Sequence, residues 1–232
     1  MEPLCVASRF PAVHLLVRWL LAPLVRLLYR PVVQGAQNIP RHGPVIIAAN
    51  HRAALDTAAI ALTAGRRVSF LGKAEYFTGT GLRGRAMAAF VSALGYIPVD
   101  RGNAKAGLDA LAAARVVLES GGAFAIYPEG TRSLDGRLHR GHTGVASLAL
   151  DTGAPVVPVA LIGTEAIQPR GARIPRLCRV TVRYGVPIDF SRYDGLAGSS
   201  AIRRAVTDQV MDTIASLSEQ EYVDAYHQRP AA

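Results

Sequence analysis

The sequence predicts an α/β fold: a single domain with a mostly parallel central sheet flanked by helices, preceded by an N-terminal membrane-associated helical segment. Two observations predict the domain. Short runs rich in β-branched residues alternate with longer segments rich in alanine and leucine, which is the pattern of strands joined by crossover helices. A chain of 232 residues is also long enough to bury a substantial core. We place the N-terminal segment at residues 1–30 and the α/β domain at residues 31–232.

The first strongly apolar stretch, residues 10–29, predicts a helix that lies on a membrane. It is interrupted by His14, Arg18 and Arg26. Such a helix would span roughly 30 Å, but an arginine near the bilayer centre costs about 2.5–3.5 kcal/mol on insertion scales. We therefore favour an interfacial helix whose arginines contact lipid phosphates. A helix that packs on the domain and a helix that crosses the bilayer stay open as alternatives.

The strands and helices of the domain follow in alternation. Strands are predicted at residues 44–49, 68–71, 123–127, 156–162 and 179–186. Helices are predicted at residues 54–64, 86–94, 104–120, 143–151 and 201–217. In the last helix apolar residues recur at helical spacing, and Ser199 or Ser200 is the expected N-cap. Because sites in such sheets gather at the carboxyl ends of strands, polar residues just after a strand are the candidates for function.

The composition indicates an anionic partner and a reduced compartment. Half of the chain is hydrophobic, the mean hydropathy is +0.21, and the net charge is +9. A strongly basic protein favours contact with nucleic acid or with an acidic lipid surface. Aromatic residues make up only 6% and no recognised nucleic-acid-binding module occurs, which disfavours nucleic acid. The two cysteines, Cys5 and Cys178, match no metal-ligand spacing and favour an intracellular location.

A histidine and an aspartate, His51 and Asp56, follow the first predicted strand of the domain. On a straight helix, side chains five residues apart diverge by about 140°, so the two can meet only if His51 lies in the turn before the helix. Asp56 would then accept a hydrogen bond from one ring nitrogen and leave the other nitrogen free to act as a base. The alternative is a structural pair, in which the helix dipole favours Asp56 and His51 is a capping donor.

The predicted strand at residues 123–127 delivers a second polar group to an exposed turn. Arg132 offers a planar set of donors suited to a phosphate. Gly130 lets the backbone approach closely, and Thr131 adds a hydroxyl. An ordinary turn with a solvated arginine is the alternative. A basic stretch further on faces either anionic lipid or only solvent; it consists of Arg170, Arg173, Arg176, Arg179 and Arg183.

Four sequence blocks in order carry a family resemblance. They are Asn50-His51-Arg52-Ala53-Ala54-Leu55-Asp56, Gly95-Tyr96-Ile97-Pro98-Val99-Asp100-Arg101, Tyr127-Pro128-Glu129-Gly130-Thr131-Arg132-Ser133 and Ala154-Pro155-Val156-Val157-Pro158-Val159-Ala160-Leu161. Together they resemble the glycerolipid acyltransferases with the HX4D motif, most of all the bacterial 1-acylglycerol-3-phosphate (lysophosphatidic acid) O-acyltransferases. The resemblance covers roughly residues 32–186. One departure is Ala53, where the family often has serine, and this weakens an auxiliary hydrogen bond.

The resemblance implies an enzyme that transfers a fatty acyl group from acyl-CoA or acyl-carrier protein to the sn-2 hydroxyl of 1-acylglycerol 3-phosphate. His51 would be the general base and Asp56 would orient it. The substrate-binding residues implied by the resemblance are Lys73, Arg101, Glu129, Gly130, Thr131 and Arg132. Since no nucleophile elbow of the Gly-x-Ser-x-Gly kind occurs, direct attack without an acyl-enzyme is the simpler expectation. Neither a cofactor nor a metal is expected, because the acyl thioester is a co-substrate.

The expected partners are lysophosphatidic acid, the acyl thioester and an anionic membrane surface, with acyl-carrier protein as one of two donors and no nucleic acid. The expected location is the cytoplasmic face of the cell membrane, with the protein peripheral or monotopic. Within the enzyme class, glycerol 3-phosphate, another lysophospholipid or a glycolipid are alternative acceptors. From other classes, the alternatives are a basic protein that binds membranes or nucleic acid without catalysis.

Overall fold

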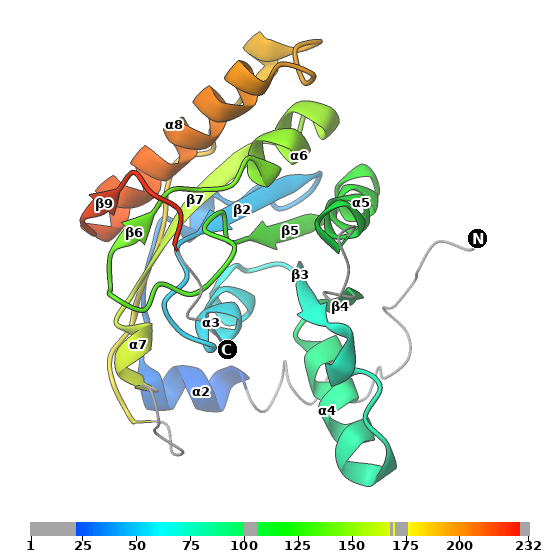
Figure 1. The fold of residues 1–232 in the computed structure, drawn as a ribbon. Helices are drawn as coiled ribbons and strands as arrows, with labels where there is room; N and C mark the ends of the chain where they lie inside the picture. The colour runs from blue at the N-terminus through cyan, green and yellow to red at the C-terminus, as the bar shows by residue number, and fades with distance from the viewer. Residues whose placement is uncertain (1–21, 100–105, 168, 170–175, 228–232) are drawn as a thin grey trace.

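The computed structural model describes residues 22–99, 106–167, 169 and 176–227. A seven-stranded sheet, with strand order β1-β8-β7-β2-β5-β3-β4, runs through the middle of this part (Figure 1). Its strands are β1 (Val32–Gln34), β2 (Val45–Ala49), β3 (Val68–Lys73), β4 (Tyr96–Val99), β5 (Ala123–Ile126), β7 (Val156–Ile162) and β8 (Thr181–Tyr184). Neighbouring strands pair in parallel except for β7 and β8, which pair antiparallel. The predicted, mostly parallel α/β sheet is therefore confirmed.

Helices cover both faces of the sheet. They are α2 (Ala22–Tyr29), α3 (Asp56–Thr63), α4 (Gly81–Ala93), α5 (Ala106–Glu119), α6 (Gly144–Thr152), α7 (Thr164–Ile167) and α8 (Ser200–Ser218), with short 3-10 helices at Ala36–Asn38, Ala74–Tyr76 and Ser191–Tyr193. In Figure 1, α6 and α8 lie above the sheet and α3 lies below it. A sheet covered in this way needs strands that are apolar on both sides.

Strand β2 shows how the sequence meets this need. Every residue of β2 is buried. Ile46 and Ala48 pack in a cluster that also contains Met211 of α8, whereas Ile47 and Ala49 pack in a cluster on the other face. The continuous apolar run at residues 44–49, which predicts a buried strand, thus supplies both cores by simple alternation.

Strand β7 coincides with the predicted strand at residues 156–162, and α8 has the predicted N-cap, because the hydroxyl of Ser199 accepts a hydrogen bond from the Ile202 amide at 3.4 Å. Helix α4 begins at Gly81, ahead of the predicted residues 86–94. Its first turn contains Gly81 and Gly84, and glycine is a weak helix former, so the pattern concealed this turn.

A second, two-stranded sheet was not predicted. It joins β6 (Leu138–His139) in parallel to β9 (Tyr222–Val223), and it brings the segment after α8 back to the loop that follows β5 (Figure 1). Strands of two residues carry no periodicity of their own. No periodic pattern therefore indicates that residues near 139 and 227 are neighbours.

The predicted N-terminal helix lies mostly outside the described residues, which begin with α2. On α2 the side chains of Leu24, Leu27 and Leu28 are exposed, and on α4 Leu82 is 87% exposed. Among the helices of the described residues, none combines the length and the apolar character needed to cross a bilayer.

Candidate active site at the carboxyl ends of the strands

His51 lies in the turn between β2 and α3, as the spacing argument requires. Strand β2 ends at Ala49 and α3 begins at Asp56, so the histidine precedes the helix and its ring folds back over the helix start. The distance from His51 Nδ1 to Asp56 Oδ2 is 2.8 Å. The side chain of Asp56 is completely buried, whereas that of His51 is 19% exposed. One ring nitrogen therefore faces a buried carboxylate while the ring edge still reaches solvent.

The same carboxylate oxygen also closes the turn. Asp56 Oδ2 accepts hydrogen bonds from the backbone amides of Arg52 at 2.6 Å and Ala53 at 2.8 Å. Because Asp56 Oδ2 is the acceptor in both of these contacts, we take it as the acceptor in the third contact as well, with the proton on His51 Nδ1. This leaves the Nε2 lone pair free. The catalytic and the capping interpretations of Asp56 are compatible, since one oxygen meets both needs.

Tyr127, for which the sequence predicts no role of its own, covers one face of the imidazole. The rings of His51 and Tyr127 are stacked, with centroids 4.0 Å apart and 13° between the planes. Tyr127 is the first residue after β5, which pairs directly with β2. Burial is the main factor that raises the pKa of the Tyr127 hydroxyl, so the phenol stays protonated, and it lies 3.0 Å from the Thr57 hydroxyl.

Asn50 fixes the end of β2 to its neighbours. This side chain is fully buried; its amide nitrogen donates to the Leu161 carbonyl at 3.0 Å, and its oxygen accepts from the Leu161 amide at 2.7 Å. It also donates to Gln220 Oε1 at 2.6 Å. The residue immediately before His51 is therefore tied to β7 and to the segment after α8, which limits movement of the turn.

Glu129 is a buried side chain that holds the backbone of His51 in place. Its two carboxylate oxygens accept hydrogen bonds from separate backbone amides, that of His51 at 3.2 Å and that of His139 at 3.0 Å. The residue is only 2% exposed. Burial raises the pKa of the Glu129 carboxyl to about 7, although the two amide hydrogen bonds act in the opposite direction. These contacts connect the histidine turn to β6 through a buried side chain.

The turn at residues 130–132 lies beside the histidine turn. The Ser133 amide donates to the His51 carbonyl at 2.7 Å, so Arg132 is one residue from a direct contact with His51. Gly130 has φ of +71°, and a Cβ there would lie 3.0 Å from His142 Cδ2. Arg132 is exposed and Thr131 is half-buried. The turn thus presents an exposed guanidinium side chain at the same edge of the sheet as His51.

Of the other two predicted cations, Lys73 lies within the described residues and Arg101 does not. Lys73 is the last residue of β3 and is exposed, at the same carboxyl edge of the sheet as His51. Arg101 lies outside the described residues. In the basic stretch, Arg176 and Arg179 are exposed, while Arg183 pairs with Glu219 at 2.7 Å. Arg170 and Arg173 also lie outside the described residues.

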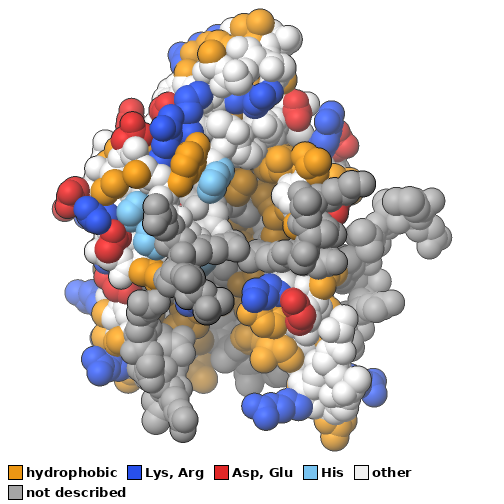
Figure 2. Space-filling model, viewed as in Figure 1, with side chains coloured by type: hydrophobic (Ala, Val, Ile, Leu, Met, Phe, Trp, Pro, Cys, Tyr) orange, Lys and Arg blue, Asp and Glu red, His pale blue; other side chains and the backbone are white. Residues whose placement is uncertain are grey.

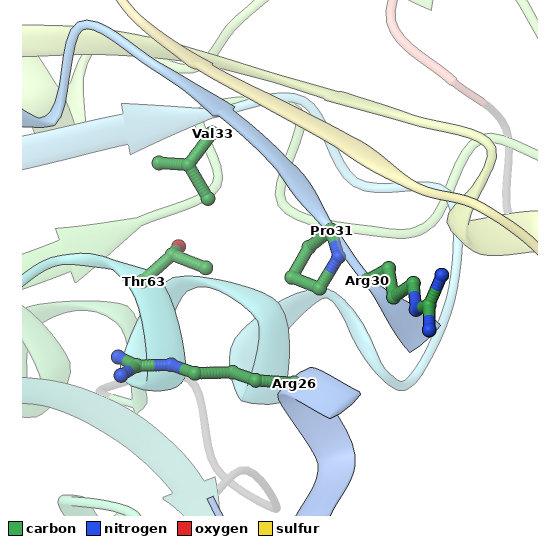
Figure 3. Close-up of a pocket in the computed structure, with 5 residues that line it drawn as sticks. All are labelled: Arg26, Arg30, Pro31, Val33 and Thr63. Carbon is green, nitrogen blue, oxygen red and sulfur yellow. The ribbon is translucent and has the colours of Figure 1, made fainter. Parts of the chain in front are cut away.

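A hollow lined by Arg26, Arg30, Pro31, Val33 and Thr63 lies elsewhere (Figure 3). Thr63 ends α3, whereas Asp56 begins it, and an eight-residue helix is about 12 Å long. The hollow is therefore at the opposite end of α3 from the His51–Asp56 pair. In Figure 3 the side chain of Arg26 extends beneath Thr63.

Comparisons with known proteins agree with one another. A family model described as acyltransferase matches residues 30–162. A chloroplastic 1-acyl-sn-glycerol-3-phosphate acyltransferase of Brassica napus is 34% identical over 145 residues, which are 62% of this chain and 40% of that protein. Its counterpart from Arabidopsis thaliana is 32% identical over 174 residues, 74% of this chain and 47% of that protein. The chain thus spans less than half the length of these two relatives.

A solved structure shares the fold. The crystal structure of the 1-acyl-sn-glycerophosphate (LPA) acyltransferase PlsC from Thermotoga maritima is similar with a TM-score of 0.61 and 24% sequence identity, covering 83% of this chain and 77% of that chain. At this level of identity the similarity supports the α/β architecture.

Proposed function

The chain belongs to the acyltransferase family, and on this premise we propose that it transfers a fatty acyl group from a thioester to the sn-2 hydroxyl of 1-acylglycerol 3-phosphate, which gives phosphatidic acid. The donor is acyl-CoA or acyl-carrier protein. The observation that carries the proposal is the contact of 2.8 Å between His51 Nδ1 and Asp56 Oδ2 at the carboxyl end of β2, beside the turn that carries the exposed Arg132. This arrangement places a base for the acceptor hydroxyl next to a cation that can bind the acceptor phosphate.

In the proposed reaction His51 Nε2 accepts the proton of the sn-2 hydroxyl while the hydroxyl oxygen attacks the thioester carbonyl carbon. The new C–O bond forms, the tetrahedral intermediate collapses, and the C–S bond breaks. The imidazolium returns the proton to the thiolate that leaves. Asp56 holds the ring in the required tautomer and stabilises the imidazolium. General-base assistance of this kind typically supplies about 10²–10⁴-fold in rate.

Binding of the acceptor phosphate needs cations, and Arg132 and Lys73 lie at the same edge of the sheet as His51. We assign this role to Arg132, with Lys73 as a further contributor, and on the family resemblance alone to Arg101, which lies outside the described residues. Gly130 and Thr131 shape the turn that presents Arg132. The contacts of Glu129 favour a supporting role, because both of its oxygens already accept from backbone amides.

We further propose that the protein works on the cytoplasmic face of the cell membrane, peripherally or as a monotopic protein. Exposed leucines of α2, namely Leu24, Leu27 and Leu28, would contact acyl chains. Arg26 and Arg30 line the adjacent hollow (Figure 3), where a lipid phosphate would meet them. This is the arrangement of an interfacial amphipathic helix, and a net charge of +9 favours anionic lipid.

The test is acyl transfer by the purified full chain in anionic vesicles, with labelled acyl-CoA or acyl-carrier protein and a panel of acceptors. We expect phosphatidic acid from 1-acylglycerol 3-phosphate, and a loss of at least about 100-fold in His51→Ala. His42→Ala is the matched control, because His42 is exposed and outside the site. Undiminished turnover by His51→Ala would show that His51 is not the general base. Transfer only to another acceptor would show that 1-acylglycerol 3-phosphate is not the substrate.

A further inference from the structure

Three potential metal ligands lie beside the site without a role in the proposed reaction. Asp135, His139 and His227 each offer one ligand atom, and these atoms all lie within 4.8 Å of one another. His139 Nε2 is 3.1 Å from each carboxylate oxygen of Asp135, and the His139 and His227 ring centroids are 4.4 Å apart. From this geometry we propose that the three side chains bind one divalent cation of the zinc class.

The ring nitrogens of the cluster support this proposal. His227 Nε2 is buried and has no hydrogen-bond partner in the described part of the chain, and the nitrogen that His139 offers to the cation is Nε2, the one next to Asp135. His139 is only 6% exposed, so its ring is largely shielded from water. Burying a polar atom without a partner is costly. A cation bound between the two rings would give a lone pair of His227 the partner that the described residues do not supply.

The backbone brings the segment that carries His227 alongside His139. In the pairing of β6 with β9, Leu138 lies opposite Tyr222 and His139 opposite Val223. The Arg140 amide then donates to the Ala225 carbonyl at 3.1 Å. On the face shown in Figure 2, histidine side chains gather over β6 and β9, close to acidic and basic side chains. The ligands are therefore presented by paired backbone segments, which lowers the entropy cost of assembling a site.

The donor set selects the class of cation. Two imidazoles and one carboxylate suit Zn²⁺ and related transition metals, whereas Mg²⁺ and Ca²⁺ prefer oxygen ligands. With bonds of about 2.0–2.1 Å, ligand atoms in a tetrahedral zinc site are roughly 3.3 Å apart. The separation of 3.1 Å between His139 Nε2 and the Asp135 oxygens is near this value. Three protein ligands leave a fourth position for water.

The cation would link the segment after α8 to the hydrogen bonds by which Glu129 supports His51. The His139 amide donates to Glu129 Oε2, and the other oxygen of Glu129 accepts from the His51 amide. The segment that carries His227 is already paired with β6 through its backbone, and a cation would add a link between side chains to that pairing. Metal binding would therefore stabilise the part of the fold that Glu129 connects to His51.

Calorimetric titration of the full chain with ZnCl₂ tests the proposal, using protein without a histidine tag that has been treated with a chelator. The variants are His227→Gln and Asp135→Asn, with His42→Gln as the control for an exposed histidine. We expect one Zn²⁺ per chain in the wild type and in His42→Gln, and affinity at least tenfold weaker in the other two. Far-UV circular dichroism verifies that each variant is folded.

Thermal unfolding gives a second readout, because a ligand that binds only the folded state raises Tm. Saturating Zn²⁺ is expected to raise Tm for the wild type and His42→Gln and to leave Tm of His227→Gln unchanged. MgCl₂ is expected to have no effect. Absence of zinc binding by the wild type, or wild-type affinity in folded His227→Gln, would overturn the proposal, and the His139–Asp135 pair would then be an ordinary hydrogen bond.

Discussion

The ring of Tyr127 lies almost parallel to the imidazole of His51, with 4.0 Å between the centroids. Asp56 holds one edge of the same imidazole through Nδ1. The ring is therefore held by its face and by its edge, and it cannot rotate without breaking one of these contacts. Such restraint keeps Nε2 in position for a hydroxyl, and accurate placement of a catalytic group accounts for much of its effect.

Two substitutions of Tyr127 distinguish the contribution of the aromatic stack from the contribution of the hydroxyl. Tyr127→Phe keeps the ring and removes the contact with Thr57, so we expect near-normal kcat and a stability loss of about 1 kcal/mol. Tyr127→Leu removes an aromatic pair worth about 0.5–1.5 kcal/mol, and we expect kcat to fall by up to about tenfold. Acyl-transfer kinetics and thermal unfolding measure both effects. Equal kcat in the two variants would show that the stack does not position His51.

Replacing Asp56 tests whether the pair is catalytic or only structural. In Asp56→Asn the imidazolium loses its buried counter-charge, so we expect kcat to fall by at least about 100-fold. The helix also loses an N-terminal carboxylate, worth about 0.3–1 kcal/mol. Asp109→Asn, in the first turn of α5 and exposed, is the control for that loss. A stability change without a change in kcat would favour the purely structural interpretation of Asp56.

The sequence could predict the meeting of His51 and Asp56 because each step depends on local pattern. An apolar run predicts β2, an Ala-rich run predicts α3, and a spacing of five positions between the two polar residues requires a turn at His51. The structure has this turn, with β2 ending at Ala49 and α3 starting at Asp56. The central strands were predictable for the same reason, since strands buried on both faces are continuously apolar.

The supports of the site could not be predicted in this way. Glu129 accepts from amides 78 and 10 residues away, and Asn50 bonds to Leu161, 111 residues away. Contacts of this kind depend on which strands become neighbours, and a periodic pattern does not specify strand order. The same holds for His139 and His227, which meet only because β6 pairs with β9. For these supporting residues, the sequence offers one signal, which is a polar residue next to the end of an apolar predicted strand.

Gly130 is expected to be the least replaceable residue of the turn. It has φ of +71°, and an added Cβ would lie 3.0 Å from the His142 ring. An L-residue in this conformation costs about 1–2 kcal/mol, so Gly130→Ala should destabilise the fold by about that amount and lower acyl transfer. Gly107→Ala is the control: its Cβ meets nothing within 4 Å in α5, and it should stabilise by about 0.5–1 kcal/mol. Equal effects on unfolding would contradict the assigned strain.

Arg132 is predicted to act on the phosphorylated acceptor. Charge-assisted hydrogen bonds contribute about 1.5–3 kcal/mol, so Arg132→Ala should raise KM for 1-acylglycerol 3-phosphate by roughly 10–100-fold and change KM for the thioester little. Arg67→Ala removes the same charge at the amino end of β3, from an exposed residue, and should leave both constants unchanged. An unchanged acceptor KM in Arg132→Ala would place the phosphate elsewhere.

Replacing Glu129 distinguishes between two roles of this residue, which are support of His51 and contact with the acceptor. In Glu129→Gln one of the two accepting oxygens becomes an amide NH₂ that faces a backbone N–H. We expect a stability loss of about 1–3 kcal/mol, a lower kcat, and an acceptor KM within about twofold of the wild type. Glu119→Gln, at an exposed ion pair with Arg115, is the matched control and should change stability by less than about 1 kcal/mol. A large rise in acceptor KM with unchanged Tm would instead support the contact with glycerol phosphate that the family resemblance implies.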